Sequence, residues 1–255
     1  MIVPEIAAGA AAELAPLRAA CDAALGRLAA SGARTLMVVG GDESDRRYSF
    51  PFRGSFAPWG VPVDVHLGPT DPALHSGPTG PAGPAHDSGP TGRVAGDEEL
   101  PLSLLVGAWL LRRAFRPAGP VTYRMETVGW ETAPAECATR GARAGSGQPW
   151  ALLVLGDGSI CRGEKSPGYH DPGAEPYDDA VAAALRGADA QALLDLDPEE
   201  SARLGVAGRA PWQLLAGAVR AAGGRWRGDL SYYAAPYGVA YFVANWDLLD
   251  REARP

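Results

Sequence analysis

The 255-residue sequence has very few lysines and cysteines, and each shortage carries information. Lys165 is the only lysine among 23 basic residues, so every other basic side chain is arginine. The three cysteines, Cys21, Cys137 and Cys161, are odd in number and far apart, and none belongs to a Cys-x-x-Cys pair. This usage fits a reduced compartment and excludes both a disulfide framework and a zinc-ribbon site.

Long apolar runs and clustered positive charges are also missing. No uninterrupted apolar stretch approaches the roughly 20 residues of a membrane span, and the start Met1–Glu5 has no basic or hydrophobic leader region. The net charge is −7, with the arginines scattered among acidic residues, which argues against a nucleic-acid surface. We therefore expect a cytoplasmic protein that binds neither membrane nor nucleic acid.

Hydrophobic residues make up 46% of the chain, enough for a sizeable core, and their spacing predicts alternating helices and strands. Such alternation is typical of parallel βα units. We therefore predict one α/β domain over residues 1–255, with a mostly parallel central sheet flanked by helices. The expected helices lie at 6–28, 100–111 and 134–144 and after 171 and 197, and a last one is marked by Trp212, Leu215 and Val219 and ends at Gly223-Gly224. The expected strands lie at 35–40, 61–67, 121–128 and 150–155, with two strands, or a strand and a bend, at 226–246.

Residues 68–97 differ in character from the rest of the chain. Gly-Pro-Thr occurs at 68–70, 77–79 and 89–91, with almost no large apolar residue between these triplets. Such a segment buries too little surface to offset the entropy of ordering it. We predict a disordered insertion within the domain, which contains two of the four histidines, His75 and His86.

The loop at 156–172 follows the apolar run 150–155 and contains the candidate site residues. Lysine is a compact charge that can lose its proton when buried, so Lys165 beside Glu164 suggests either a base or nucleophile, or a solvated charge. Asp157 and Ser159 are either cleft residues or turn residues, since Asp-Gly is a common turn dipeptide. A second candidate wall is the segment 40–47, at the exit of another strand.

Several short motifs carry a resemblance to a known family. They are Asp157-Gly158-Ser159, the segment 164–169, Asp171-Pro172, Ala135-Glu136-Cys137, the segment 208–212 and the segment 235–239. Together they resemble an actinobacterial group of LigB-like proteins, which are related to the class III extradiol ring-cleavage dioxygenases. The resemblance implies a LigB-like α/β fold for this domain and, in active members, a non-haem Fe(II) held by two histidines and a carboxylate. Another histidine acts in acid/base catalysis, and the metal keeps open positions for substrate and O₂.

The chain departs from the pattern of active members in two places. The group opens with a strand and a His-Pro-Pro turn before a segment like Ile2–Glu5, which here follows Met1 directly. Either the coding sequence starts upstream, or this protein has lost a metal ligand. In the loop, the Gly-Asp-x-Ser-His pattern ends in Ile160, which cannot transfer a proton.

Two functions therefore remain open. One is a LigB-like, Fe(II)-dependent aromatic ring-opening dioxygenase, against which the two missing histidines weigh. The other is a metal-free small-molecule-binding or regulatory protein that retains the fold. Both predict a small-molecule ligand in a cleft lined by Asp157, Ser159, Glu164, Lys165 and His170. The remaining metal candidates are His66 and His170 with Glu131, Glu164 or Asp157, although His66 also fits a polar strand face and His170 a loop.

Overall fold

The computed structural model describes residues 2–68, 99–144 and 150–250. Of the predicted insertion at 68–97, all but Gly68 lies outside these residues. The described helices are α1 (Pro4–Ala7), α2 (Ala15–Ala30), α3 (Leu102–Ala114), α4 (Pro134–Ala144), α5 (Ala174–Gly187), α6 (Ala190–Leu194), α7 (Pro198–Arg203) and α8 (Arg209–Ala222). The described strands are β1 (Thr35–Asp42), β2 (Arg46–Tyr48), β3 (Phe52–Ser55), β4 (Asp64–Leu67), β5 (Thr122–Gly129), β6 (Trp150–Leu155), β7 (Arg225–Ala234) and β8 (Tyr241–Asp250).

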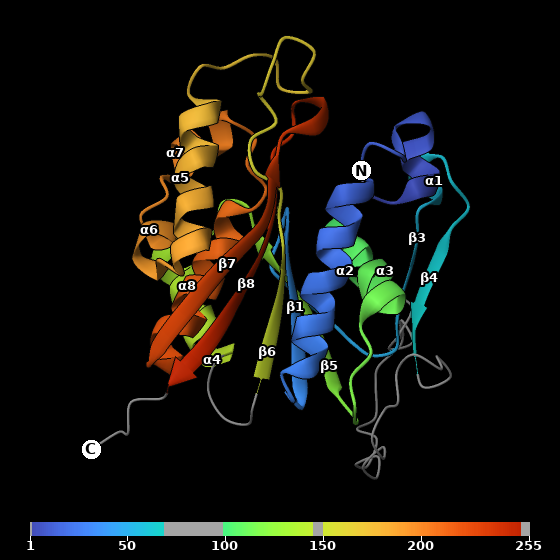
Figure 1. The fold of residues 1–255 in the computed structure, drawn as a ribbon, viewed down its shortest axis with the longest axis vertical. Helices are drawn as coiled ribbons and strands as arrows, with labels where there is room; N and C mark the ends of the chain where they lie inside the picture. Colours follow the sequence, from blue (N-terminus) through green and yellow to red (C-terminus); the bar gives the residue numbers. More distant parts are fainter. Residues whose placement is uncertain (1, 69–98, 145–149, 251–255) are drawn as a thin grey trace, which may run out of the picture.

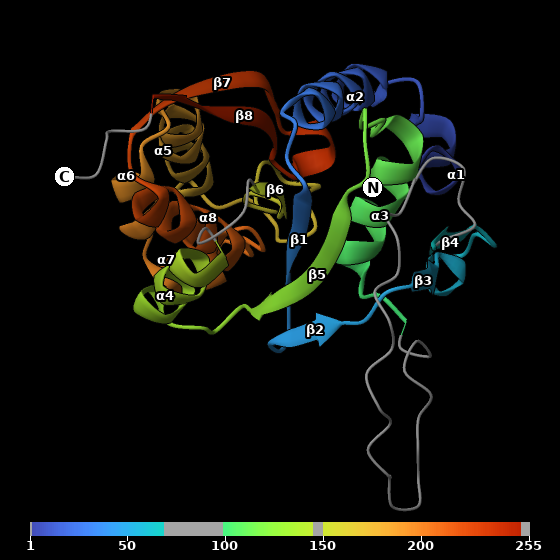
Figure 2. The ribbon, with the colours of Figure 1, turned by 90° about the horizontal axis from the view of Figure 1, so that it is seen from below.

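A four-stranded sheet with the order β2-β5-β1-β6 forms the centre of the fold. Strand β1 pairs in parallel with both β5 and β6, and β2 pairs antiparallel with β5 at the edge. Helices α2 and α3 cover one face, and α4 and α8 cover the other (Figure 1, Figure 2). The fold is therefore mixed α/β with a mostly parallel sheet flanked by helices, as the sequence predicts.

Alternation along β1 sends neighbouring side chains into two different cores. Val38 joins the cluster formed with α2 and α3, which includes Leu17 and Leu104. Val39 joins the cluster on the opposite face, with Leu214 of α8. A parallel strand buried on both faces needs apolar residues at consecutive positions, which is why β1 reads as a continuous apolar run.

The C-terminal half adds a hairpin and a third apolar cluster. Strands β7 and β8 pair antiparallel, so of the two alternatives for the tail, two strands is the correct one. Both views place β8 beside β6, although these two strands belong to separate sheets (Figure 1, Figure 2). The cluster beneath the hairpin joins α5 and α8 through Val181 and Trp212.

Two predicted elements have wrong bounds, and some elements were not predicted. The expected helix at 6–28 is interrupted, because Ala8 has a φ of 45° and α2 starts only at Ala15, with Pro16 in its first turn. The strand expected at 61–67 begins at Asp64, since Val63 instead donates its N–H to the Val61 carbonyl in a turn. Strands β2 and β3 and helix α6 were not predicted.

In the described part of the chain, no helix combines the length and the apolar character that a membrane crossing requires. The longest, α2, has 16 residues and carries charged side chains.

Candidate functional site at the carboxyl edge of the sheet

Strands β1 and β6 are neighbours and end at the same edge of the sheet. The chain leaving β1 forms β2, β3 and β4 before it reaches α3 on one face, whereas the chain leaving β6 leads to α5, which shares an apolar cluster with α8 on the other face. Open α/β sheets bind ligands outside the carboxyl ends of their strands at such a switch point. We call the residues Gly40–Asp42, Ser103, Gly156 and Asp157 the β1–β6 edge.

Asp157 supplies the carboxyl group of the β1–β6 edge. Asp157 is exposed as a residue, whereas its carboxyl group lies close to surrounding protein, and this burial raises its pKa to about 6. No described residue forms a hydrogen bond with this carboxylate. The pKa of Tyr241 is raised mainly by burial and, in second place, by the negative charge of Asp157, so the two groups lie near each other. An accessible carboxyl group that titrates near neutrality can exchange a proton with a ligand.

Ser103 approaches the end of β1 from the first turn of α3. A Cβ atom added to Gly40 would lie 2.3 Å from the Ser103 Oγ, so only glycine permits this approach. The Ser103 hydroxyl is buried and has no hydrogen-bond partner among the described residues. Buried hydroxyls are normally paired, and this one is therefore available to a water molecule or a ligand at the edge.

Trp130 follows β5 at the same edge, and the residue is 48% exposed. Its backbone N–H donates to the Asp42 carbonyl over 2.9 Å, and its carbonyl accepts a hydrogen bond from Arg209. A Cβ atom added to Gly41 would lie 2.9 Å from the indole Nε1, which shows how closely the ring covers β1. Sequence reasoning missed both Trp130 and Ser103; the position of Trp130 directly after a predicted strand was the available signal.

The hydrogen bonds of Ser159 indicate a structural role. The residue is fully buried, and its Oγ donates to the Asp178 Oδ2 over 2.5 Å while its N–H donates to Oδ1 over 2.9 Å. Its hydroxyl is thus engaged by α5 and is not free to contact a ligand beside Asp157.

Glu164 and Lys165 are exposed residues of the loop between β6 and α5, which is drawn in yellow at the top of Figure 1. No described residue forms an ion pair with Lys165, and the two neighbours are not paired with each other. Of the two interpretations, the exposure of Lys165 favours the solvated charge, and the base or nucleophile, which burial would favour, stays a prediction. The turn around it is held by Ser166, whose Oγ donates to the carbonyls of Gly163 at 2.6 Å and Tyr169 at 2.8 Å.

His170 is also exposed, at the rim of a separate cavity of about 450 Å³. The other lining residues are Cys161, Arg162, Gly163, Asp171, Pro172 and Glu175. Arg162 is paired with Glu175 over 3.0 Å, and Asp171 with Arg203, so most charges in this lining already compensate each other. The predicted cleft residues are therefore divided: Asp157 lies at the sheet edge, His170 at this cavity, and Ser159 in the interior.

The two remaining metal candidates come from different parts of the fold. His66 lies exposed on β4, opposite Arg53 of β3, and helices α2 and α3 separate this hairpin from the loop that carries His170 (Figure 1). Glu131 is exposed beyond β5. Within residues 2–68, 99–144 and 150–250, no three His, Cys, Asp or Glu side chains are grouped so that they could hold a metal. The described residues thus do not fit an Fe(II) facial triad.

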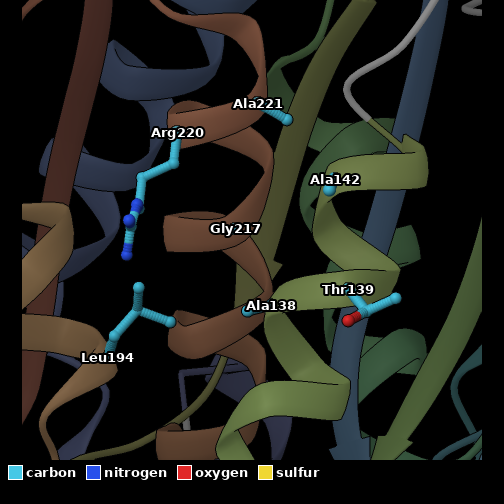
Figure 3. A pocket seen from close by; sticks show the side chains of 7 residues that line it. All are labelled: Ala138, Thr139, Ala142, Leu194, Gly217, Arg220 and Ala221. Carbon is cyan, nitrogen blue, oxygen red and sulfur yellow. The ribbon is translucent and has the colours of Figure 1, made fainter.

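A further cavity of about 360 Å³ lies between α4 and α8 (Figure 3). Its lining is Ala138, Thr139, Ala142, Leu194, Gly217, Arg220 and Ala221, without any carboxylate, thiol or imidazole. Arg220 donates to the Gln191 Oε1 over 3.1 Å and is not directed at an open anion site.

Comparisons with known proteins add little about activity. No family model matches the chain, and no curated protein sequence matches it. Among solved structures, the chain is similar to the uncharacterized protein JW3007 from Escherichia coli K12, with a TM-score of 0.45, 10% sequence identity, and coverage of 88% of this chain and 90% of that chain. This likeness is too weak to establish a shared fold, and it assigns no activity.

Proposed function

We propose that this chain is a LigB-like α/β protein that binds a small molecule at the β1–β6 edge without Fe(II). The observation that supports the proposal best is Asp157, an exposed residue at the switch point of the sheet whose carboxyl pKa is raised by burial to about 6. At neutral pH such a group is mostly ionised and accepts a hydrogen bond from a ligand hydroxyl or amine.

Ser103 and Trp130 extend the site beyond a single carboxylate. The unpaired Ser103 hydroxyl supplies a donor and an acceptor beside Gly40, and the exposed Trp130 ring supplies an apolar surface at the end of β5. A few polar groups beside an aromatic ring are typical of small-molecule sites. The expected ligand is small and carries a hydroxyl or amine group next to an apolar body.

The surroundings of Ile160 support binding over ring cleavage. This residue occupies the position where the resemblance implies a proton-transferring histidine, and its N–H donates to the Leu204 carbonyl over 3.0 Å. A Cβ atom at Gly168 or Gly205 would contact the Ile160 side chain within 3 Å. Ile160 therefore serves as a packing residue that fixes the loop.

Catechol is a suitable probe, because its hydroxyls can donate hydrogen bonds to a carboxylate. It is a possible ligand under both candidate functions. Under anaerobic, metal-free conditions we expect catechol to shift the Asp157 carboxyl resonance in ¹³C NMR. Asp157→Asn should weaken calorimetrically measured binding by about tenfold, the effect of losing one charge-assisted hydrogen bond. Lys165→Arg is the matched loop control and should leave binding unchanged. Equal affinities of wild type and Asp157→Asn would contradict the proposal.

The second candidate, an Fe(II)-dependent ring-opening dioxygenase, is favoured by the motif resemblance alone. Its test is anaerobic loading with Fe(II), metal analysis after desalting, and O₂ uptake in the presence of catechol. Retention of about one Fe(II) per chain, as a facial triad would give, together with O₂ consumption, would overturn the metal-free proposal. We expect no Fe(II) to be retained.

A further inference from the structure

Asp178 of α5 is a fully buried carboxylate directly behind the candidate site. It accepts two hydrogen bonds from Ser159, from the N–H over 2.9 Å and from Oγ over 2.5 Å. A third comes from the Arg162 Nη1 over 3.3 Å. A buried charge persists only where donors and an opposite charge compensate its desolvation, and here both come from the loop that follows β6.

The turn 157–159 is held on two further sides. The Gly208 N–H, at the start of α8, donates to the Asp157 carbonyl over 2.9 Å. On the side of β8, the Gly158 N–H donates to the Ala240 carbonyl, and the Ala240 N–H donates to the Ser159 carbonyl, each over 2.9 Å. Three elements, α5, α8 and the start of β8, thus fix three consecutive residues.

Gly158 shows how tightly this turn is packed. A Cβ atom there would lie 2.8 Å from the Asp178 Oδ1 and 2.7 Å from the Phe242 ring. No side chain fits between Asp178 and the backbone that it holds. A change in the position of Asp178 would therefore be transmitted directly to the residue before Gly158, which is Asp157.

The other partners of Arg162 keep the arrangement rigid. Besides Asp178, this guanidinium donates to the Tyr233 hydroxyl and to the Glu175 Oε1, each over 3.0 Å. The Tyr233 hydroxyl in turn donates to the Asp179 Oδ1 over 2.7 Å. Asp178 and Asp179 are thus neighbours on α5, but only Asp178 contacts the turn that carries Asp157.

We propose that Asp178 is a positioning residue that fixes the turn 157–159 and so holds the Asp157 carboxyl group at the β1–β6 edge. The inference rests on the proposed function, because it gives Asp157 its role there. If the turn loosens, more water reaches the Asp157 carboxyl group, and the burial that raises its pKa is relieved. The pKa should then fall from about 6 toward the ordinary value of 3.8.

The test is a ¹³C NMR titration of the Asp157 carboxyl group, assigned with Asp157→Asn, in three variants of the full chain. Asp178→Asn keeps the size of the side chain but removes the negative charge that forms an ion pair with Arg162. Ser159→Ala removes one anchoring hydrogen bond without changing any charge. Asp179→Asn is the matched control, since it removes a charge from the adjacent position of α5 but no contact to the turn.

We expect Asp178→Asn and Ser159→Ala both to lower the titration midpoint of Asp157, and Asp179→Asn to leave it unchanged. An unchanged midpoint in folded Ser159→Ala and Asp178→Asn would overturn the inference, as would an equal shift in Asp179→Asn, which would indicate a charge effect. If Asp178→Asn does not fold, Ser159→Ala decides alone. Because the titration needs no ligand, its outcome is separable from failure of the proposed function, which is judged by catechol binding to Asp157→Asn.

Discussion

At the scale of single residues, the loop after β6 uses its polar side chains in three different ways. Asp157 is an exposed residue with a raised pKa, Ser159 is hydrogen-bonded to Asp178, and Lys165 is an exposed charge. Polar residues of one motif therefore do not share one function. Their surroundings, which are built from α5, α8 and β8, separate them.

The raised pKa of Asp157 predicts a pH-dependent cost to folding. The folded protein holds the proton more tightly than the unfolded chain, so ionisation opposes folding. The cost is absent below the ordinary pKa of 3.8, grows as the pH rises to about 6, and persists above that. Asp157→Asn should thus be more stable than wild type at neutral pH. We expect a difference of about 1 kcal/mol, less than the full pKa shift would give, because the residue is exposed and solvent screens part of the effect.

Urea unfolding of both proteins between about pH 4 and pH 7 measures this difference, and other acidic groups cancel in the comparison. The advantage of the Asn variant should increase with pH over this range. A constant or decreasing advantage would show that the pKa of Asp157 is not raised in the folded protein.

At the scale of elements, helices α4 and α8 are in backbone contact through two glycines. A Cβ atom at Gly141 would lie 1.9 Å from the Leu214 carbonyl oxygen, and one at Gly217 would lie 2.2 Å from that of Ala138. Alanine at either position must push the helices apart. Gly26 of α2, by contrast, has open space around its Cβ position.

Gly141→Ala should destabilise the protein by about 1–3 kcal/mol, the usual cost of overpacking. Gly26→Ala should stabilise it by up to about 1 kcal/mol, because alanine loses less backbone entropy in a helix. Thermal or urea unfolding of the two variants makes the comparison. Similar effects of the two substitutions would contradict the described helix contact.

The elements predicted best were those with strong local signals. The bounds of α4 and β6 agree with the predicted ranges 134–144 and 150–155, since Pro134 starts the helix and a short apolar run defines the strand. Strand β2 has only three residues, two of them arginine, and exists through pairing with β5. Such pairing is a tertiary interaction, so no local pattern indicates it.

At the scale of the whole molecule, an arginine and the apolar clusters link the C-terminal hairpin to the rest of the fold. Arg27 of α2 forms ion pairs with Asp229 of β7 and, over 2.6 Å, with Asp247 of β8. All three side chains are more than a third exposed, so solvent screens the pairs. Trp212 of α8 is 5% exposed, and its ring packs edge to face against that of Phe242 of β8, with 5.8 Å between the ring centroids.

Arg27→Ala should therefore cost less than about 1 kcal/mol and lose its effect in high salt, where exposed ion pairs are screened. Trp212→Ala should cost about 3–5 kcal/mol at any salt concentration, because it leaves a cavity in the core. Unfolding free energies at low and high ionic strength test both. If Arg27→Ala lowered the free energy of unfolding more than Trp212→Ala, the ion pairs and not the apolar clusters would hold the hairpin, which contradicts this prediction.

The amino-acid sequence by itself determined the α/β class, the mostly parallel sheet and the polar loop after β6, because apolar periodicity and strand-end positions are local properties. The insertion at 68–97 and the LigB-like resemblance stay predictions. Only the tertiary structure decided which loop residues meet: it placed Ser159 against Asp178, separated His66 from His170, and brought Ser103 to Gly40. These contacts join residues distant in the chain, and they depend on helix packing and sheet order, which no local pattern encodes.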